Sequence, residues 1–153
     1  MMPDNKEQFN TPADFYFKVI VNDLEGIHEA GFQNVSGLEV KIETESIQEG
    51  GENQFSHKLP KPLKSSNLIL KRGILVGSPI ITWISTAVQE FIFKPKMVTV
   101  ILMNEKDESL VSWSFHNAYP VSVKVSDLNS TENKYAIETL ELAYDYFERS
   151  DNK

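Results

Sequence analysis

The sequence predicts a mainly β protein with a single flanking helix. Runs of alternating apolar and polar residues are typical of half-buried strands. One capped stretch has apolar residues three and four positions apart, which is typical of an amphipathic helix. The chain has 153 residues, and folding at that size buries roughly 70% of the surface of the unfolded chain. No internal repeat or linker interrupts it, so residues 1–153 are expected to form one domain.

Alternation marks the first strands. From Phe15 to Val21 the odd-numbered residues are apolar and are expected to share one face. From Leu38 to Glu45 the pattern predicts a strand with one core face and one water face. The residues expected to face the core are Leu38, Val40 and Ile42, and those expected to face water are Glu39, Lys41, Glu43 and Glu45.

Later strands are expected at four places. A short one runs from Asn67 to a glycine stop at Gly73. The run from Met97 to Met103 is almost wholly apolar, which predicts a strand covered on both faces. Two further alternating runs, 111–115 and 121–125, are expected to be separated at Tyr119-Pro120, because proline has no N–H to donate to a ladder.

One helix is predicted between Ser78 and Phe91. Ser78 can cap the first turn, and Pro79 suits the first helical position. Lys94-Pro95 should end the segment. The apolar stripe predicts a helix that covers a sheet or closes a barrel end, with Trp83 as its packing anchor. The stripe consists of Ile80, Trp83, Ile84, Ala87, Val88 and Phe91.

The segment from Lys134 to Arg149 fits both periods, so the pattern leaves strand and helix open. The polar ends of the chain predict a flexible N-terminal segment, residues 1–12, and a loose C-terminus, residues 149–153.

The sequence offers no catalytic, cofactor-binding or metal-binding residues, and the protein is predicted not to be an enzyme. Cysteine is absent, which excludes thiolate chemistry and disulfides. His28, His57 and His116 lack metal-ligand spacing. Phosphate loops and nucleophile elbows are also missing.

Charge and hydropathy restrict the partners and the location. The net charge of −7 argues against nucleic acid as a surface partner. No run approaches the roughly 18 apolar residues of a membrane span. The N-terminus lacks a signal-peptide pattern, so we expect synthesis in the cytoplasm.

Charge is segregated in the middle of the chain. From Glu39 to Glu52 there are five acidic residues and one lysine, whereas from Asn53 to Arg72 there are five basic residues and no acid. Solvated surface charge explains this pattern without any contact. An oppositely charged arm, opened by Gly50-Gly51 and stiffened by prolines, also suits head-to-tail contact between copies of the chain.

A series of short motifs resembles the tail-tube proteins of contractile phages, and more closely the inner-tube subunits of phage-tail-like contractile injection particles. The resemblance covers about residues 13–147. It implies hexameric rings that stack into a hollow tube driven by a contracting sheath. The implied fold is an antiparallel β-barrel or sandwich with one helix, related to the haemolysin-coregulated-protein tube of type VI secretion, and the last segment is then a strand. The motifs are Phe15-x-Phe17-x-Val19, Gly31-Phe32-x-x-Val35-Ser36-Gly37-Leu38, Glu49-Gly50-Gly51, Leu59-Pro60, Leu68-x-Leu70-Lys71-Arg72-Gly73, Trp83-Ile84 and Glu138-Thr139-Leu140-Glu141-Leu142.

The resemblance assigns roles to residues. Residues 46–64 become an extended inter-subunit loop, in which the arm from Gly50 to Lys64 reaches a neighbouring ring. The resemblance also implies sheath and baseplate partners, protein cargo in the lumen, and assembly into a phage tail or a released injection particle. The alternative is a monomeric β-rich binding module that grips a peptide or another small partner with the same arm. The expected ring-stacking residues are Glu49, Gly50, Gly51, Glu52, Lys58, Lys61, Lys64, Lys71 and Arg72, and the candidates for the lumen wall are Glu39, Glu43 and Glu45.

Overall fold

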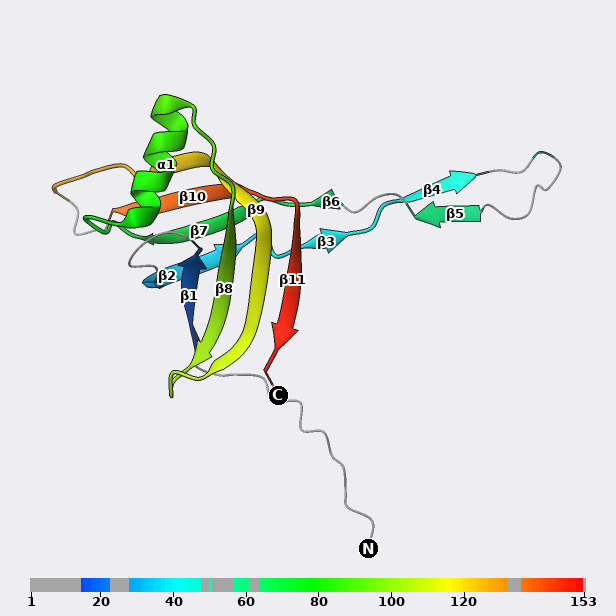
Figure 1. Cartoon of the computed structure of the whole chain (residues 1–153), viewed down its shortest axis with the longest axis horizontal. Coiled ribbons are helices and arrows are strands. Elements are labelled where there is room, and N and C mark those ends of the chain that lie inside the picture. Colours follow the sequence, from blue (N-terminus) through cyan, green and yellow to red (C-terminus); the bar gives the residue numbers. More distant parts are fainter. Residues whose placement is uncertain are drawn as a thin grey trace, which may run out of the picture.

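The computed structural model describes residues 15–22, 28–47, 50, 57–60, 64–131 and 136–152. It has a body of curved strands with one helix against it, and an arm that projects from the body (Figure 1). The expected N-terminal segment 1–12 lies outside the described residues. The body contains β1 (Phe15–Val21), β2 (His28–Ser36), β7 (Leu68–Gly73), α1 (Pro79–Glu90), β8 (Lys96–Asn104), β9 (Ser109–Val125), β10 (Ile137–Ala143) and β11 (Tyr146–Asp151), and the arm contains β3 (Val40–Lys41), β4 (Thr44–Ile47), β5 (His57–Pro60) and β6 (Lys64–Ser65).

The sheet of the body closes on itself. Its order is β10-β7-β2-β1-β8-β9-β11, and an additional pairing joins β10 to β9. Every pairing is antiparallel. Six strands, β1, β2, β7, β10, β9 and β8, therefore form a closed antiparallel barrel, and β11 is attached to β9 outside that circuit. The predicted mainly β fold with one helix is confirmed.

Strand β9 runs through Pro120, so the predicted break at Tyr119-Pro120 is wrong. Its pairing with β8 extends to Ala118, and beyond that point β9 pairs with β10. The β10–β9 register shifts between Glu141 and Leu142, and Leu142 lies opposite Pro120. Proline is tolerated here because β9 changes partner and its new ladder is irregular, so the missing N–H interrupts no regular ladder.

The last segment is strand, as the resemblance implied. β10 and β11 follow one edge of β9 in succession: Ala143 lies opposite Tyr119, and Tyr146 lies opposite His116. The C-terminus is not loose from residue 149, because β11 continues to Asp151 opposite Val111. The backbone of Asn152 also donates to the Leu110 carbonyl at 2.9 Å.

Alternation places the barrel core largely as predicted. Val19 and Val21 are buried, although Phe15 at the start of the same face is 51% exposed. In β8 the expectation of two covered faces is only partly met: Val98 and Val100 are fully buried, while Ile101 on the other face is half-buried. The residues of the main cluster are Val19, Val21, Phe32, Leu68, Leu70, Ile80, Trp83, Ile84, Val98, Val100, Phe115, Ala118, Leu140 and Leu142.

The helix begins and ends close to the predicted residues. Ser78 is at the N-cap position, but its side chain makes no capping hydrogen bond, so that part of the expectation is wrong. Pro79 is the first helical residue, and Phe91 adopts a left-handed conformation that ends the helix. Trp83 is 6% exposed, and its indole N–H donates to the Lys94 carbonyl at 3.1 Å, which fits its expected anchoring position. The predicted stripe is too long, however, because Val88 is 63% and Phe91 80% exposed.

We predict that replacing Leu140 with alanine destabilises the fold strongly. Leu140 is fully buried and lies opposite both Leu70 and Val123. The lost burial and the cavity should lower the free energy of unfolding by about 2–5 kcal/mol, measured by urea denaturation. The matched control, Leu128→Ala at a 77% exposed site, should change it by less than about 0.5 kcal/mol. Equal effects at the two sites would contradict the assigned core.

Candidate functional site

The most distinctive surface of the molecule is its arm. Two short antiparallel ladders, β3–β6 and β4–β5, form it, and neither belongs to the barrel sheet. Figure 1 shows the arm extending away from the body on the side opposite α1. An isolated two-stranded ribbon is at best marginally stable in water. A projecting ribbon of this kind would gain stability from contact with a partner.

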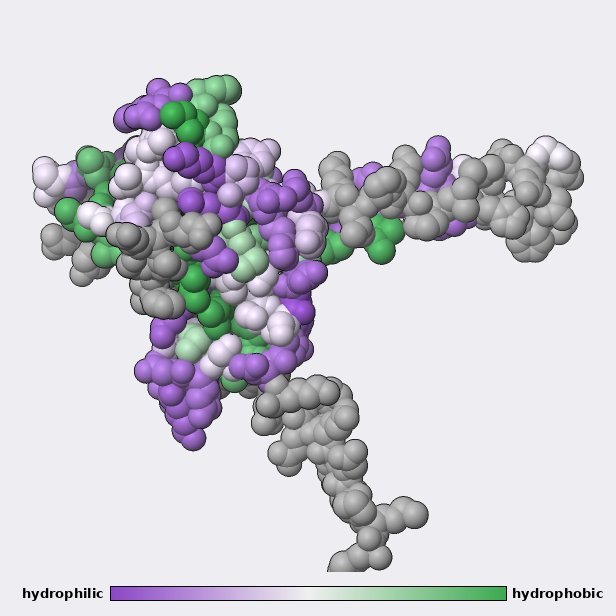
Figure 2. Space-filling view, in the orientation of Figure 1, coloured by the Kyte–Doolittle hydropathy of each residue, from purple (hydrophilic) through white to green (hydrophobic). Residues whose placement is uncertain are grey.

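The arm begins at Val40, earlier than the expected loop at residues 46–64. The predicted two-faced strand is in fact two short arm strands, and its apolar face does not enter the core. Val40 is 52% and Ile42 59% exposed, and Figure 2 shows apolar surface on the arm close to the body. Only Leu38, ahead of the arm, packs against the core cluster.

The root of the arm is fixed to the body. Gly37 has φ +88°, and a Cβ at this position would lie 1.9 Å from the Asn67 carbonyl oxygen. Nearby, the Tyr144 hydroxyl donates to the Ser66 carbonyl at 2.7 Å, and the Asn67 amide donates to Glu141 at 2.9 Å. The two chain segments that leave the barrel are therefore in close contact where the arm starts.

The charged residues predicted for the arm are found in several places. Lys58 is exposed in β5, directly opposite Ser46, and Gly50 is exposed in a turn. Lys64 is in β6, and Lys71 is exposed in β7 of the barrel. Ring stacking by these residues stays a prediction. The remaining expected stacking residues Glu49, Gly51, Glu52 and Lys61 lie outside the described residues.

The acidic candidates for the lumen wall lie at the root of the arm or on the arm, not on the barrel sheet. Glu39 and Glu43 line a shallow cleft at the arm root together with Lys41, Ser65 and Ser66. Glu45 lies further out, in β4, opposite Leu59. Their role in a lumen stays a prediction.

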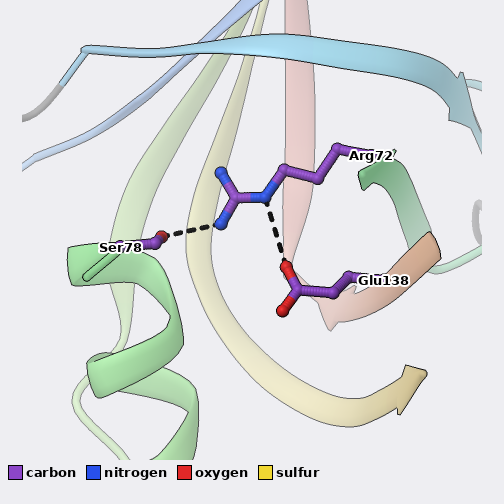
Figure 3. A network of polar contacts seen from close by, with 3 residues as sticks. All are labelled: Arg72, Ser78 and Glu138. Atoms are coloured by element: carbon purple, nitrogen blue, oxygen red, sulfur yellow. Dashed lines mark hydrogen bonds and ion pairs between the residues drawn. The ribbon is translucent and has the colours of Figure 1, made fainter. Parts of the chain in front are cut away.

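Arg72 is buried, whereas Lys58 and Lys71 are exposed. It is 1% exposed and points into the barrel. Its Nε lies 3.4 Å from Glu138 Oε2, and its Nη2 donates to Ser78 Oγ at 2.7 Å (Figure 3). The guanidinium also lies over the Phe32 ring, 4.9 Å from its centroid. Direct contact of Arg72 with another subunit is incompatible with this burial, so we assign it a role inside the subunit.

Two strand edges of the body are open within the described chain. β11 pairs with β9 alone, and the part of β9 from Tyr119 to Val125 pairs with β10 alone. Unpaired edges present N–H and C=O groups that can accept another strand. Sequence periodicity did not reveal these edges, because it identifies strands without identifying their neighbours.

Exposed apolar side chains border the open edge of β9. Phe91 packs edge-on against Phe93, which packs against Tyr119, with centroids 4.9 and 5.9 Å apart. Figure 2 shows the apolar surface at the end of α1. The turn from β7 to α1 also exposes an apolar run, with Val76 98% exposed. The further apolar residues exposed around this end of the barrel are Ile74, Leu75, Val88, Ile92, Val121, Val123, Val125, Leu128 and Ile137.

The described residues contain no cluster of three or more His, Asp or Glu side chains arranged to hold a metal ion. His116 stacks on Tyr146 with centroids 4.3 Å apart, and its Nε2 lies 3.7 Å from Glu148. None of the helices described is long and apolar enough to cross a membrane.

Comparison with known proteins gives a consistent result. Residues 13–148 match the model of the T4-like virus tail tube protein gp19 family. A chain in the anti-feeding prophage baseplate structure is 28% identical, with a TM-score of 0.81, over 93% of this chain and 97% of that one. A chain in the extended sheath-tube complex of the PVC extracellular contractile injection system is 26% identical, with a TM-score of 0.79, over 95% of each. Hcp1 from Flavobacterium johnsoniae, 17% identical with a TM-score of 0.58 over 90% of this chain and 99% of that one, shares the fold. No curated protein matches the chain.

We predict that Gly37→Ala disturbs the root of the arm. The added Cβ collides with the Asn67 backbone, and the left-handed φ disfavours alanine. The free energy of unfolding should fall by at least ~1 kcal/mol, and the amide NMR signals of Asn67 and Leu68 should shift. Gly73→Ala is the control, because its Cβ meets nothing within 4 Å. Unchanged stability and spectra for Gly37→Ala would refute this packing.

A second prediction concerns the open edge of β11. Arg149 donates to both carboxylate oxygens of Asp151, at 2.6 and 3.1 Å. These hydrogen bonds hold the pKa of Asp151 below its ordinary value. The stabilisation is therefore complete above about pH 4, the ordinary pKa of aspartate, and is lost as the pH falls through the lowered pKa. An NMR titration of the Asp151 carboxyl should show its pKa rising in Arg149→Gln, whereas identical titrations would exclude the pair in solution.

Proposed function

The chain belongs to the T4-like virus tail tube protein gp19 family, and we propose that it is an inner-tube subunit of a contractile injection system or phage tail. In this role it forms hexameric rings that stack into a hollow tube, which sheath contraction drives forward with its cargo. The projecting arm is the observation that carries the proposal. It exposes Val40 and Ile42 on a ribbon that no other layer of the described chain covers.

The open edges support ring formation. In a ring, the edge of β11 or of Tyr119–Val125 would meet a different surface of the next subunit. Such a contact is heterologous, and repeating it with the right rotation closes a ring. Pairing between neighbours would satisfy the edge N–H and C=O groups and would remove the risk of unspecific aggregation that open edges carry.

The arm supports stacking of the rings. It extends beyond the body (Figure 1) and exposes the basic Lys58 in β5. A neighbouring ring would cover the exposed apolar residues, and burial of apolar surface is worth roughly 25 cal/mol per Å². The stacking residues would be the arm positions expected from the sequence together with Lys71, whereas Arg72 would contribute from inside the subunit.

The work of such a subunit is mechanical, and we infer that it is not catalytic. The related chains in baseplate and sheath-tube structures support sheath and baseplate proteins as partners. We also propose protein cargo in the lumen, with Glu39, Glu43 and Glu45 as the residues that would repel acidic cargo. Synthesis in the cytoplasm would precede assembly into a tail or a released particle.

We predict that reversing the charge of Lys58 weakens stacking. Lys58→Glu should raise the critical concentration for assembly, measured by sedimentation, about two- to fivefold at low salt, since exposed ion pairs contribute little. The salt dependence of assembly should also decrease. Combined reversal of Lys58, Lys61 and Lys64 should have a larger effect.

The matched control is Lys106→Glu, on the exposed turn between β8 and β9. It changes the net charge equally, far from the arm (Figure 1). Equal effects of Lys58→Glu and Lys106→Glu would assign the result to net charge and reject the arm contact. Sedimentation of the wild type at its monomer mass under all conditions would instead favour the monomeric binding module.

A further inference from the structure

Arg72 lies at the centre of a row of buried residues that crosses three strands. Its direct partners in the sheet are Phe32 on β2 and Glu138 on β10. Directly opposed residues of antiparallel strands have side chains on the same face. All three are buried, at 1%, 4% and 8% exposure, so this face is the barrel interior. One guanidinium thus contacts both neighbouring strands at once.

The same guanidinium connects the barrel to the helix. Ser78, which accepts the hydrogen bond from Nη2, is the N-cap of α1 and is 7% exposed. The chain between Arg72 and Ser78 turns outward through Ile74, Leu75 and Val76, which are 44%, 47% and 98% exposed. Both ends of this turn are therefore tied together inside the barrel, while its apolar tip faces solvent.

A contribution to fold stability does not by itself explain why this buried position carries an arginine. Removing a charge from water is costly, and a buried ion pair often contributes no more than an apolar residue of similar size. The guanidinium differs from such a residue because its planar fork fixes several partners in one geometry. Here the partners are Glu138, Ser78 and Phe32, and the segment whose position they determine is the exposed turn 73–77.

We propose that Arg72 is a positioning residue for assembly: it holds the turn 73–77 and the start of α1 in the one placement that can contact another copy of the chain. This proposal rests on the proposed tube function. Lys71 and Arg72 are adjacent in β7 and lie on opposite faces of the strand. Lys71 is exposed on the surface, whereas Arg72 positions the turn 73–77 from inside the barrel.

The test is a double-mutant cycle on the full chain. Ser78→Ala removes the hydroxyl acceptor, and Arg72→Lys keeps a positive charge near Glu138 but loses the fork. Either change should speed amide hydrogen exchange about tenfold at Ile74 and Thr82, whose N–H groups donate to the carbonyls of Ala136 and Ser78, the loss expected for a hydrogen bond to a charged group, while exchange in β8 stays unchanged. Combining them should add little, because both remove the same interaction. Ser78→Thr, which keeps the hydroxyl, should behave as the wild type, as should the control Ser85→Ala on α1.

Assembly is measured in parallel, as the critical concentration for sedimentable particles. Ser78→Ala and Arg72→Lys should each raise the critical concentration several-fold, whereas Ser78→Thr should leave it at the wild-type value. Additive effects on exchange would show that Ser78 acts independently of Arg72, and equal acceleration in β8 would show a merely structural role; either result overturns the proposal. A loosened turn with normal assembly also overturns it. If the wild type itself does not assemble, the proposed function fails, whereas the exchange cycle still shows whether Arg72 positions the turn.

Discussion

Backbone pairing along β9 is the constraint on which the rest of the structure depends. A strand has only two edges, and β9 gives one to β8 and the other to β10 and β11 in succession. The barrel closes because β9 continues beyond its pairing with β8 and pairs there with β10. The same arrangement leaves β11 and the end of β9 with open edges, so closure of the subunit and the edges that the proposed ring contacts would use have one origin.

The closed barrel also explains where the arm and the buried charge lie. β7 must pair with both β2 and β10 to complete the circuit, and this brings Glu138 opposite Arg72 inside it. The chain leaving β2 can return to β7 only by way of the arm. Gly37 permits this departure because its backbone approaches Asn67 more closely than any side chain would allow.

The sequence was informative where local pattern and tertiary burial agree. β1 and the part of α1 from Ile80 to Ala87 follow their apolar periods, and Ser78-Pro79 marks the helix start correctly. β2 was not expected from alternation, because its strand character comes from pairing with β1 and β7 on both sides. Val40 and Ile42 alternate like core residues yet are exposed, because the arm projects from the body and packs against no second layer of the described chain. Arg72 was placed outside because charge alone does not identify a buried partner, and Glu138 lies 66 positions further along the chain.

Electron microscopy of the purified full chain at increasing concentration shows whether copies of the chain associate with one another. We expect hollow rods of stacked rings, in which the arm and the β11 edge of each subunit lie against neighbouring subunits. Particles that stay at the size of a single 17.4 kDa chain at every concentration and salt, with arm and edges free, would contradict this expectation.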